Sequence, residues 1–225
     1  MNLPYLCGYF LGDKSGSNYL AMTYFLSHID TVDWDLAQRL NANFGGDLYE
    51  LSSSRTFHLS LSQTLLNKVH NLQSSFSCYY EYYKSLLEDE KDSFLLGLFD
   101  AIGDVKPFKG SSKIVFTCND DESLLIVSSY LVEFNIKYLL KKVGTKYSVS
   151  VCNQEDVQGL FVRLYSKNKV FSRKNYEKLM KTRYSIHTYT FKDVKYLSKK
   201  HLLNCTNISS SMFYYWMKKG IITKS

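Results

Sequence analysis

Hydrophobic and polar positions follow the same order twice along the chain, about ninety residues apart. Residues 6–13 and 95–102 are short apolar segments that can be laid over each other, and both favour a helix. Each carries small residues four positions apart, a spacing that lets two helices approach backbone to backbone. These small residues are Gly8 and Gly12 in the first segment and Gly97 and Ala101 in the second. The repeat predicts two copies of one fold, paired along a pseudo-two-fold axis.

Behind each apolar segment, the pattern predicts the same succession of elements. In the first copy the expected elements are a strand over 18–27, a helix over 31–40 ended by Gly45 and Gly46, a hairpin over 47–51 and 55–62, and a helix over 63–72. In the second copy they are a strand over 113–118, a helix over 122–134, a hairpin over 137–142 and 146–152, and a helix over 154–165, with a short extra strand over 105–108. The order α-β-α-β-β-α occurs twice, which is an α+β fold. Because the first copy has little room ahead of its first strand, its sheet is expected to be smaller.

A connector and a C-terminal extension complete the predicted organisation. Residues 79–84 hold four tyrosines and lead into an acidic run at 88–92, a composition that favours a stiff connector over a loose linker. The expected boundaries are residues 1–90 for the first repeat, 91–185 for the second repeat and 186–225 for the extension.

The C-terminal extension resembles a helix-turn-helix. The pattern predicts two helical segments, residues 194–203 and 208–220, on either side of a polar turn. Ser209 is a good N-cap for the second helix, and Gly220 is a good residue to end it. The expected core of the extension consists of Leu202, Leu203, Ile208, Phe213 and Trp216. A helical hairpin that only caps the second repeat is the alternative.

Composition and charge narrow the possible functions. The chain has 225 residues, of which 45% are hydrophobic, so it can bury a sizeable core. Its formal net charge is +7, and residues 167–225 contain 14 of its 28 Lys and Arg residues but only two acids, Glu177 and Asp193. This distribution favours a polyanionic partner. Nucleic acid is favoured over a membrane because no long amphipathic basic helix accompanies the charge.

The cysteines and the N-terminal segment exclude several other classes. Five cysteines without CxxC spacing indicate neither a zinc site nor a disulfide framework. An intracellular, reducing compartment is therefore expected, such as the cytoplasm or nucleoid, the host cell of a phage or virus, or an organelle. The apolar stretch over residues 3–12 is short and lacks the basic flank of a signal peptide. No apolar run is long enough to span a bilayer.

The two apolar segments resemble the sequence motif of the LAGLIDADG homing endonucleases. In that family the paired motif helices pack between two repeats, each helix ends in an acidic residue that binds a divalent metal ion, and two saddle-shaped antiparallel sheets lie over the DNA duplex. The resemblance implies a monomeric pseudo-dimer, double-stranded DNA as the partner, and Mg²⁺ or another divalent cation as the cofactor. Asp13 matches the family's acid. Ile102 stands at the matching position of the second motif, and Lys14 stands where the family usually has glycine.

Asp13 is the leading candidate for catalysis and for metal binding. Phosphodiester hydrolysis needs a deprotonated water and a neutralised phosphate, and a carboxylate that holds Mg²⁺ beside the DNA backbone supplies both. The alternative for Asp13 is a solvated acid paired with Lys14. Asp104 is a candidate metal ligand in place of the missing second acid if the turn after Ala101 is rearranged. Asp100 lies about 200° around the helix from the last motif position, and otherwise both acids are expected to be surface or capping residues.

Two lysines are candidates for stabilising charge in the transition state. When the two copies are laid over each other, Lys84 falls on Lys174, each just after the third helix of its repeat. The family resemblance implies that basic residues near this point line the water pocket around the metals, where a lysine can stabilise the developing phosphorane charge. The alternative is that both lysines contact phosphate groups or are solvated.

The remaining candidates are basic and aromatic residues that would contact DNA. On the predicted hairpins they are Arg55, His58, Lys137, Lys141, Lys142 and Lys146. In the C-terminal part they are Arg173, Lys199, Lys200, Tyr214, Tyr215, Lys218 and Lys219. The hairpins would enter the major groove, and the aromatic side chains would contact sugar and phosphate or pack beneath the lysines. The tyrosines of the connector fit either DNA contact or internal packing.

The sequence therefore predicts a sequence-specific duplex-DNA-binding protein. One hypothesis is a Mg²⁺-dependent endonuclease that cuts or nicks a long, near-palindromic target. A second hypothesis is a DNA-binding transcriptional regulator of the same fold that has lost cleavage, which Ile102 favours. The third, a protein-interaction module, leaves the basic C-terminal segment without an obvious role.

Overall fold

The computed structural model describes residues 3–13, 28–31, 33–51, 56–108, 111–168, 170–181, 189–192, 194–196, 199–206 and 208–224. The first copy consists of α1 (Leu3–Gly12), β1 (His28–Thr31), α2 (Trp34–Phe44), β2 (Gly46–Leu51), β3 (Thr56–Leu61) and α3 (Gln63–Ser75). After α4 (Tyr79–Ser85), the second copy consists of α5 (Glu88–Ile102), β4 (Gly103–Phe108), β5 (Ser111–Cys118), α6 (Asp121–Glu133), β6 (Leu139–Val143), β7 (Lys146–Val151) and α7 (Gln154–Ser166), and α8 (Arg173–Lys181) follows. The predicted order α-β-α-β-β-α is confirmed in both copies, and the short extra strand is β4. The strand expected over residues 18–27 lies outside the described residues.

Local capping interactions explain where several of these helices begin and end. The side chain of Asp33 accepts a hydrogen bond from the N–H of Leu36, and Asp120 and Asn153 cap α6 and α7 in the same way. Gly45 ends α2 with a φ of 70°, a left-handed conformation that glycine adopts without strain. The end of α2 predicted from the glycine pair is therefore confirmed.

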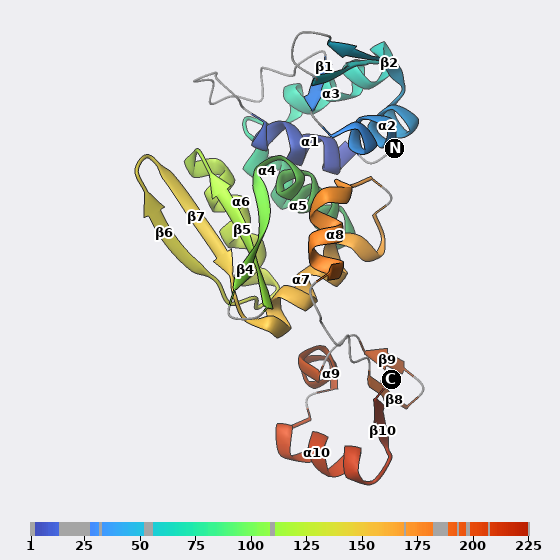
Figure 1. Ribbon diagram of the computed structural model, residues 1–225, viewed down its shortest axis with the longest axis vertical. Coiled ribbons are helices and arrows are strands. Elements are labelled where there is room, and N and C mark those ends of the chain that lie inside the picture. The colour runs from blue at the N-terminus through green and yellow to red at the C-terminus, as the bar shows by residue number, and fades with distance from the viewer. Residues whose placement is uncertain are drawn as a thin grey trace.

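The two apolar segments form parallel helices, α1 and α5, that pack side by side between the two repeats (Figure 1). We call their contact line the seam. A Cβ added to Gly8 would collide with a backbone carbonyl of α5, and one added to Gly97 would collide with a carbonyl of α1. Further along the seam, Gly12 faces Ala101. Although α1 is apolar throughout, none of the described helices has both the length and the apolar character needed to cross a membrane.

An antiparallel sheet lies on each side of the seam (Figure 1). The strand order is β1-β3-β2 in the first sheet and β4-β5-β7-β6 in the second. In the second sheet, Ile114 and Phe116 of β5 and Val149 and Val151 of β7 are buried on the face that α6 and α7 cover. Because side chains alternate along a strand, the neighbouring residues lie on the opposite, open face. In the described part of the chain the first sheet has three strands and the second has four. The segment ahead of β1, on which the expectation of a smaller first half depends, lies outside the described residues.

The C-terminal extension is a separate small unit of strands and helices. It consists of β8 (Tyr189–Phe191), β9 (Val194–Tyr196), α9 (Lys199–Thr206), α10 (Ser210–Lys218) and β10 (Ile222–Lys224), with the strand order β10-β8-β9. Its buried core is formed by Phe191, Leu202, Phe213 and Ile222, and the partly buried Leu203, Ile208 and Trp216 pack against this core. The hydroxyl of Ser209 caps α10, as predicted. The prediction of a helix from residue 194 is wrong, because residues 194–196 pair with β8 and the helix starts at Lys199.

Candidate nucleic-acid interface

The seam ends differently on its two helices. Asp13 directly follows α1, where its N–H donates a 2.9 Å hydrogen bond to the carbonyl oxygen of Tyr9. At the matching position Ile102 is the last residue of α5, and it is partly buried against the core. A Cβ on Gly12 would come within 3.0 Å of a methyl carbon of Ile102, so this side chain packs on the seam itself. One helix therefore ends in a carboxylate and the other in hydrocarbon.

A pocket of about 430 Å³ lies beside this end of the seam. We call it the seam pocket. Both repeats line it: Tyr9 comes from α1, Thr31 and Asp33 come from the first copy, and Gly103 comes from the start of β4. Its charged lining residues are Asp33, Asp100, Asp104, Lys174 and Lys178. Of the two lysines expected near the metals, only Lys174 is among them.

Asp100 is one of the acids of the seam pocket. Its carboxylate accepts a 2.7 Å hydrogen bond from the N–H of Ser172 and a 2.8 Å hydrogen bond from the hydroxyl of Tyr5. Burial raises the pKa of Asp100 to about 7, although these two hydrogen bonds act in the opposite direction. The expectation of a surface or capping residue is wrong, because the chain before α8 folds over this face of α5.

Asp104 reaches the seam pocket without any rearrangement after Ala101. The helix α5 passes directly into β4, where Asp104 pairs with Val115 and lies on the open face of the sheet. There its carboxylate accepts a hydrogen bond from the ammonium group of Lys178. Burial alone would raise the pKa of Asp104, but the hydrogen bond and charge of Lys178 outweigh this effect and lower it. Asp104 thus stays ionised and paired, whereas the expectation for it was a metal ligand or a capping residue.

Lys84 lies elsewhere in the fold. It is on α4, just before the start of α5, and its ammonium nitrogen is 4.8 Å from the ring centroid of Tyr80. Since α5 has 15 residues, its two ends are about 22 Å apart, and the seam pocket is at the other end. The structure therefore does not bring Lys84 and Lys174 together. Lys178, one turn after Lys174 on α8, was missed because the overlay of the two copies compares aligned positions only.

The seam end does not fit the two-acid metal site that the family resemblance implies. The side chain of Ile102 offers no ligand atom, and the carboxylate of Asp104 is engaged by an ammonium group. Within the described residues, no three His, Cys, Asp or Glu side chains gather into a group that could hold a metal ion. Asp13 is left as a single acid, so no hydrolytic step through a metal follows from this geometry.

The open face of the second sheet is rich in lysine. Lys106 of β4 pairs with Lys113 of β5, and both alternate with the buried pair of Val105 and Ile114. The same alternation places Lys141 and Lys146 on this face. The sequence-based candidates therefore included two of the four lysines and missed Lys106 and Lys113. Strand alternation around the apolar residues would have found them.

Of the two other hairpin candidates, Lys142 lies away from the open face. Lys142 pairs with Tyr147, on the side that the helices cover, and its ammonium nitrogen is 5.6 Å from the ring centroid of that tyrosine. Lys137 precedes β6, and its N–H donates a 3.4 Å hydrogen bond to the carboxylate of Asp156. The hairpin around β6 and β7 thus presents its lysines in two directions.

The open face of the first sheet has a different character. Asp47, Tyr49, Thr56, His58 and Ser60 lie on it, opposite the buried Leu59 and Leu61. The ring of His58 lies 4.7 Å from the ring of Tyr49, centroid to centroid. Among the described side chains this face carries no lysine or arginine. Arg55, the basic candidate of this hairpin, lies outside the described residues.

The C-terminal candidates form an exposed aromatic and basic surface on α10. Tyr214 and Tyr215 are 63% and 55% exposed; Lys218 is the last residue of the helix, and Lys219 directly follows it. The ammonium nitrogen of Lys199 lies 4.2 Å from the ring centroid of Tyr214. The other two candidates of this part are Arg173, which forms a 2.7 Å ion pair with Glu177, and Lys200, which lies in α9. In the connector, by contrast, Tyr79, Tyr82 and Tyr83 are buried, which identifies them as packing residues.

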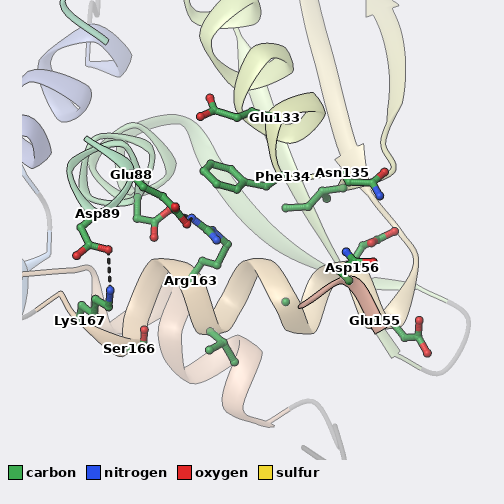
Figure 2. Close-up of a pocket in the computed structure, with 15 residues that line it drawn as sticks. Glu88, Asp89, Glu133, Phe134, Asn135, Glu155, Asp156, Arg163, Ser166 and Lys167 are labelled. Atoms are coloured by element: carbon green, nitrogen blue, oxygen red, sulfur yellow. Dashed lines mark hydrogen bonds and ion pairs between the residues drawn. The ribbon is translucent and has the colours of Figure 1, made fainter. Parts of the chain in front are cut away.

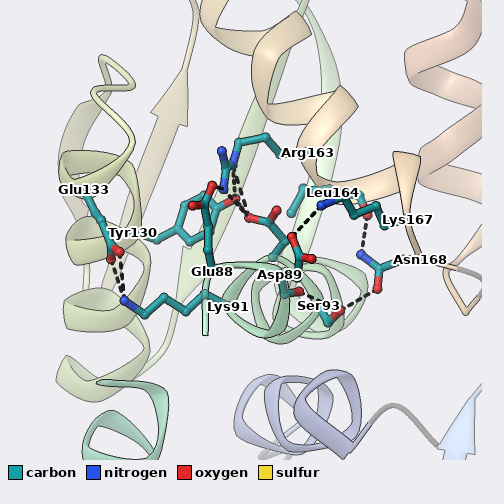
Figure 3. Close-up of polar contacts among 11 residues, drawn as sticks. Glu88, Asp89, Lys91, Ser93, Tyr130, Glu133, Arg163, Leu164, Lys167 and Asn168 are labelled. Atoms are coloured by element: carbon teal, nitrogen blue, oxygen red, sulfur yellow. Dashed lines mark hydrogen bonds and ion pairs between the residues drawn. The ribbon is translucent and has the colours of Figure 1, made fainter. Parts of the chain in front are cut away.

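The opposite end of α5 is acidic. A second pocket of about 450 Å³ lies there between α5, α6 and α7, and Figure 2 shows Arg163 extending into it from α7. Arg163 lies 3.6 Å from the ring centroid of Phe134 and forms ion pairs with Glu88 and Asp92 (Figure 3). Lys91 and Glu133 add a further ion pair between α5 and α6. These contacts hold the start of α5 against the second sheet's helices, so the seam is fixed at this end.

The comparisons with known proteins identify this class of fold. Residues 89–195 match the family described as LAGLIDADG-like domain. A mutant of I-SmaMI has a similar structure, with 14% identity, a TM-score of 0.53 and coverage of 80% of this chain and 90% of that chain. The crystal structure of I-DmoI in complex with DNA and Ca is similar at 17% identity and a TM-score of 0.51, covering 80% of this chain and 100% of that one. Mesophilic variants of the homing endonuclease I-DmoI are similar at 18% identity and a TM-score of 0.50, covering 75% and 99%.

The chain is an α+β pseudo-dimer of the two-repeat LAGLIDADG type. Residues 89–195, which include the second motif, match the LAGLIDADG-like domain, and the similar solved structures share the fold, so the expected fold class is confirmed. The search of curated proteins found no match.

Proposed function

We propose that the chain binds double-stranded DNA sequence-specifically, through the open faces of its two sheets and its C-terminal extension. The observation that carries this proposal is the lysine-rich open face of the second sheet, where Lys106, Lys113, Lys141 and Lys146 project from the strands. I-DmoI, which shares the fold, was crystallised with DNA. Lysines on such a surface contact phosphate groups and orient the protein on the duplex.

We further propose that the chain cleaves DNA poorly or not at all. Hydrolysis of both strands by metal ions requires anchoring at both helix ends, and Ile102 removes one of the two acids. The alternative, an active Mg²⁺-dependent endonuclease, has support in Asp13 at the seam end and in Asp104, which lines the seam pocket. A regulator that retains binding and has lost cleavage fits Ile102 better.

The same proposal assigns roles to the three parts of the chain. Residues 1–90 and 91–185 form the two halves that lie along the duplex. Residues 186–225 form a helix-turn-helix-like unit, in which α10 presents its tyrosines and lysines to the DNA. The separate core of this unit supports an independent role in binding, since it does not depend on the packing of the two repeats.

Selection of duplexes from a random pool, followed by a cleavage assay on the selected sequence, tests this function. We expect enrichment of a defined sequence and little or no cleavage, with or without Mg²⁺. Affinity should fall by about a thousandfold between low and moderate salt if about six phosphates are contacted. Affinity that hardly changes with salt, together with no enriched duplex, would instead indicate the protein-interaction module.

A further inference from the structure

The open face of the second sheet carries apolar side chains as well as lysines. The strand β6 lies at the outer edge of this sheet, and its side chains alternate between the two faces (Figure 1). Leu139, Lys141 and Val143 share the open face, because Leu140, between the first two, pairs with the buried Val149 of β7. Leu139 is 56% exposed and Val143 is 63% exposed. Two aliphatic side chains therefore flank a lysine on the surface proposed to bind DNA.

These two aliphatic side chains do not contribute to the interior of the protein. Leu139 and Val143 belong to neither hydrophobic cluster of the described residues, and their partners on β7 are the polar Ser150 and Lys146. Single exposed aliphatic residues are common on protein surfaces. Here, however, two of them lie on one face of one strand with a cation between them. A partner that covers this face would gain affinity by removing their apolar surface from water.

The polar groups around these side chains indicate the chemistry of that partner. Neither β6 nor β7 contains an acidic residue. Lys141 and Lys146 supply positive charge on the open face, and Ser148 and Ser150 supply hydroxyl groups there. Such a surface fits a polyanion that also displays apolar groups. In duplex DNA, the apolar group displayed in the major groove is the C5-methyl group of thymine.

The shape of the hairpin also fits the major groove. The strands β6 and β7 are joined by the two residues Gly144 and Thr145, and Gly144 has a φ of 63°, as such tight turns require. The last pair of the hairpin, Val143 with Lys146, lies beyond the part of β7 that pairs with β5, which begins at Tyr147. The hairpin thus ends as a ribbon of two strands, and the major groove of B-DNA, about 12 Å wide, admits such a ribbon.

We propose that Leu139 and Val143 contact the C5-methyl groups of thymine in the major groove and thereby specify thymine at two positions of the target. This inference rests on the proposed DNA-binding function and adds the base that this part of the surface selects. A strand rises about 3.3 Å per residue, and B-DNA rises about 3.4 Å per base pair. Because the two residues are four positions apart, the two thymines lie about four base-pair steps apart, on either strand of the duplex.

Replacement of single thymines by deoxyuridine, which lacks only the C5-methyl group, tests the inference on the full chain. The affinity for the selected duplex and for each substituted duplex is measured by fluorescence anisotropy. We expect the wild type to lose about fourfold in affinity at two positions, the effect of one buried methyl group. Leu139→Ala should abolish the loss at one position, and Val143→Ala should abolish it at the other. Neither variant should change the salt slope, because no charge is removed.

Leu140→Ala is the matched control, because Leu140 is 50% exposed on the same strand but lies on the face that the helices cover. This variant should keep both losses, and any effect of the missing methyl group on the duplex itself is common to all variants. Circular dichroism and thermal unfolding show whether each variant is folded.

Three results would each overturn the inference. They are a selected target without thymine, wild-type affinity that no deoxyuridine substitution lowers, and losses that persist unchanged in both Leu139→Ala and Val143→Ala. Failure of the wild type to enrich any duplex would overturn the proposed function itself.

Discussion

The open faces of the two sheets differ in charge, although the strands of both sheets alternate buried apolar residues with residues on the open face. The second sheet presents Lys106, Lys113, Lys141 and Lys146, while the described face of the first sheet presents Asp47, Tyr49, His58 and hydroxyl groups. Where the inner face of each sheet is buried, it carries apolar residues such as Leu59 and Ile114, because polar groups there would lose water without compensation. The outer face has no such restriction, so the two copies could diverge there while the fold was kept.

The two motif helices show a similar contrast between shared and divergent positions along their length. In the middle of the seam the copies are alike, since Gly8 and Gly97 both allow backbone contact. At its end they differ, with Asp13 on one helix and Ile102 on the other. Close packing therefore keeps the middle of the two motif helices alike, whereas their ends differ. The predictions below test this contrast.

The largest effect is expected at the middle of the seam. Gly8→Val and Gly97→Val should each destabilise the fold by about 4 kcal/mol or more, because the new side chain meets backbone of the other helix. Chemical denaturation measures the loss. Gly159→Ala is the control, since a Cβ at this position in α7 meets nothing within 4 Å and should add about 0.5–1 kcal/mol. A large difference between the stability losses of Gly8→Val and Gly97→Val would show that the two motif helices do not contribute equally to the seam.

The next effect concerns Asp100, which aligns with the buried Leu11 of the first motif. Its folded pKa of about 7 lies above the unfolded value of about 3.9. The stability that its protonation contributes is present below about pH 4 and is lost as the pH rises through about 7, a change of at most about 4 kcal/mol. Asp100→Asn should lack this decline in a series of denaturation curves. Parallel stability profiles for the variant and the wild type would contradict the prediction.

The C-terminal extension follows the second repeat and has no counterpart after the first. The DNA affinity of a chain without the extension therefore shows what the two repeats contribute to binding. Deleting residues 189–225 removes seven lysines and a unit with its own core. We expect affinity to fall about a hundredfold and the salt slope to become shallower by several units, with the two repeats still folded. An unchanged slope in a folded variant would show that the extension serves packing alone.

Restoring symmetry at the end of the seam should have an intermediate effect. Ile102→Asp replaces a packed side chain by a carboxylate near Asp13, which should lower the free energy of unfolding by about 2 kcal/mol without metal. Added Mg²⁺ should recover part of this stability and allow some nicking of the selected duplex. Ile102→Asn is the control, since it lacks the charge. Robust Mg²⁺-dependent cleavage by the wild type, abolished in Asp13→Asn, would show that Ile102 does not limit catalysis.

The smallest effect is expected for single residues on the two open faces. Lys106→Gln and Lys113→Gln should each weaken DNA binding about tenfold and lower the salt slope by about one unit. His58→Ala, on the first sheet, should leave the slope unchanged, because this change removes no lysine or arginine from the surface. Lys142→Gln is the control within the second sheet, since its side chain lies on the helix-covered face. Equal salt slopes for all four variants would contradict the prediction that the open face of the second sheet contributes more to DNA binding than the open face of the first.

Much of the fold followed from local signals in the sequence. The repeat of apolar segments, the glycine pair after α2 and the N-cap at Ser209 are short-range features, and the structure has the corresponding elements. The local pattern predicts a helix from residue 194, but residues 194–196 form a strand, because their pairing with β8 depends on residues that the local pattern does not include. For the candidate site, the sequence led to Lys141, Lys146 and Lys174 but not to Lys106, Lys113 or Lys178.

The sequence by itself determined the order of elements and the pairing of the two motif helices, because periodicity and residue size act within a few turns. Only the tertiary structure decided that Ser172 covers Asp100 and that Lys178 reaches Asp104. These pairs are 72 and 74 residues apart along the chain. Their contact depends on how α5, β4 and α8 pack together, and no spacing along the chain records that packing.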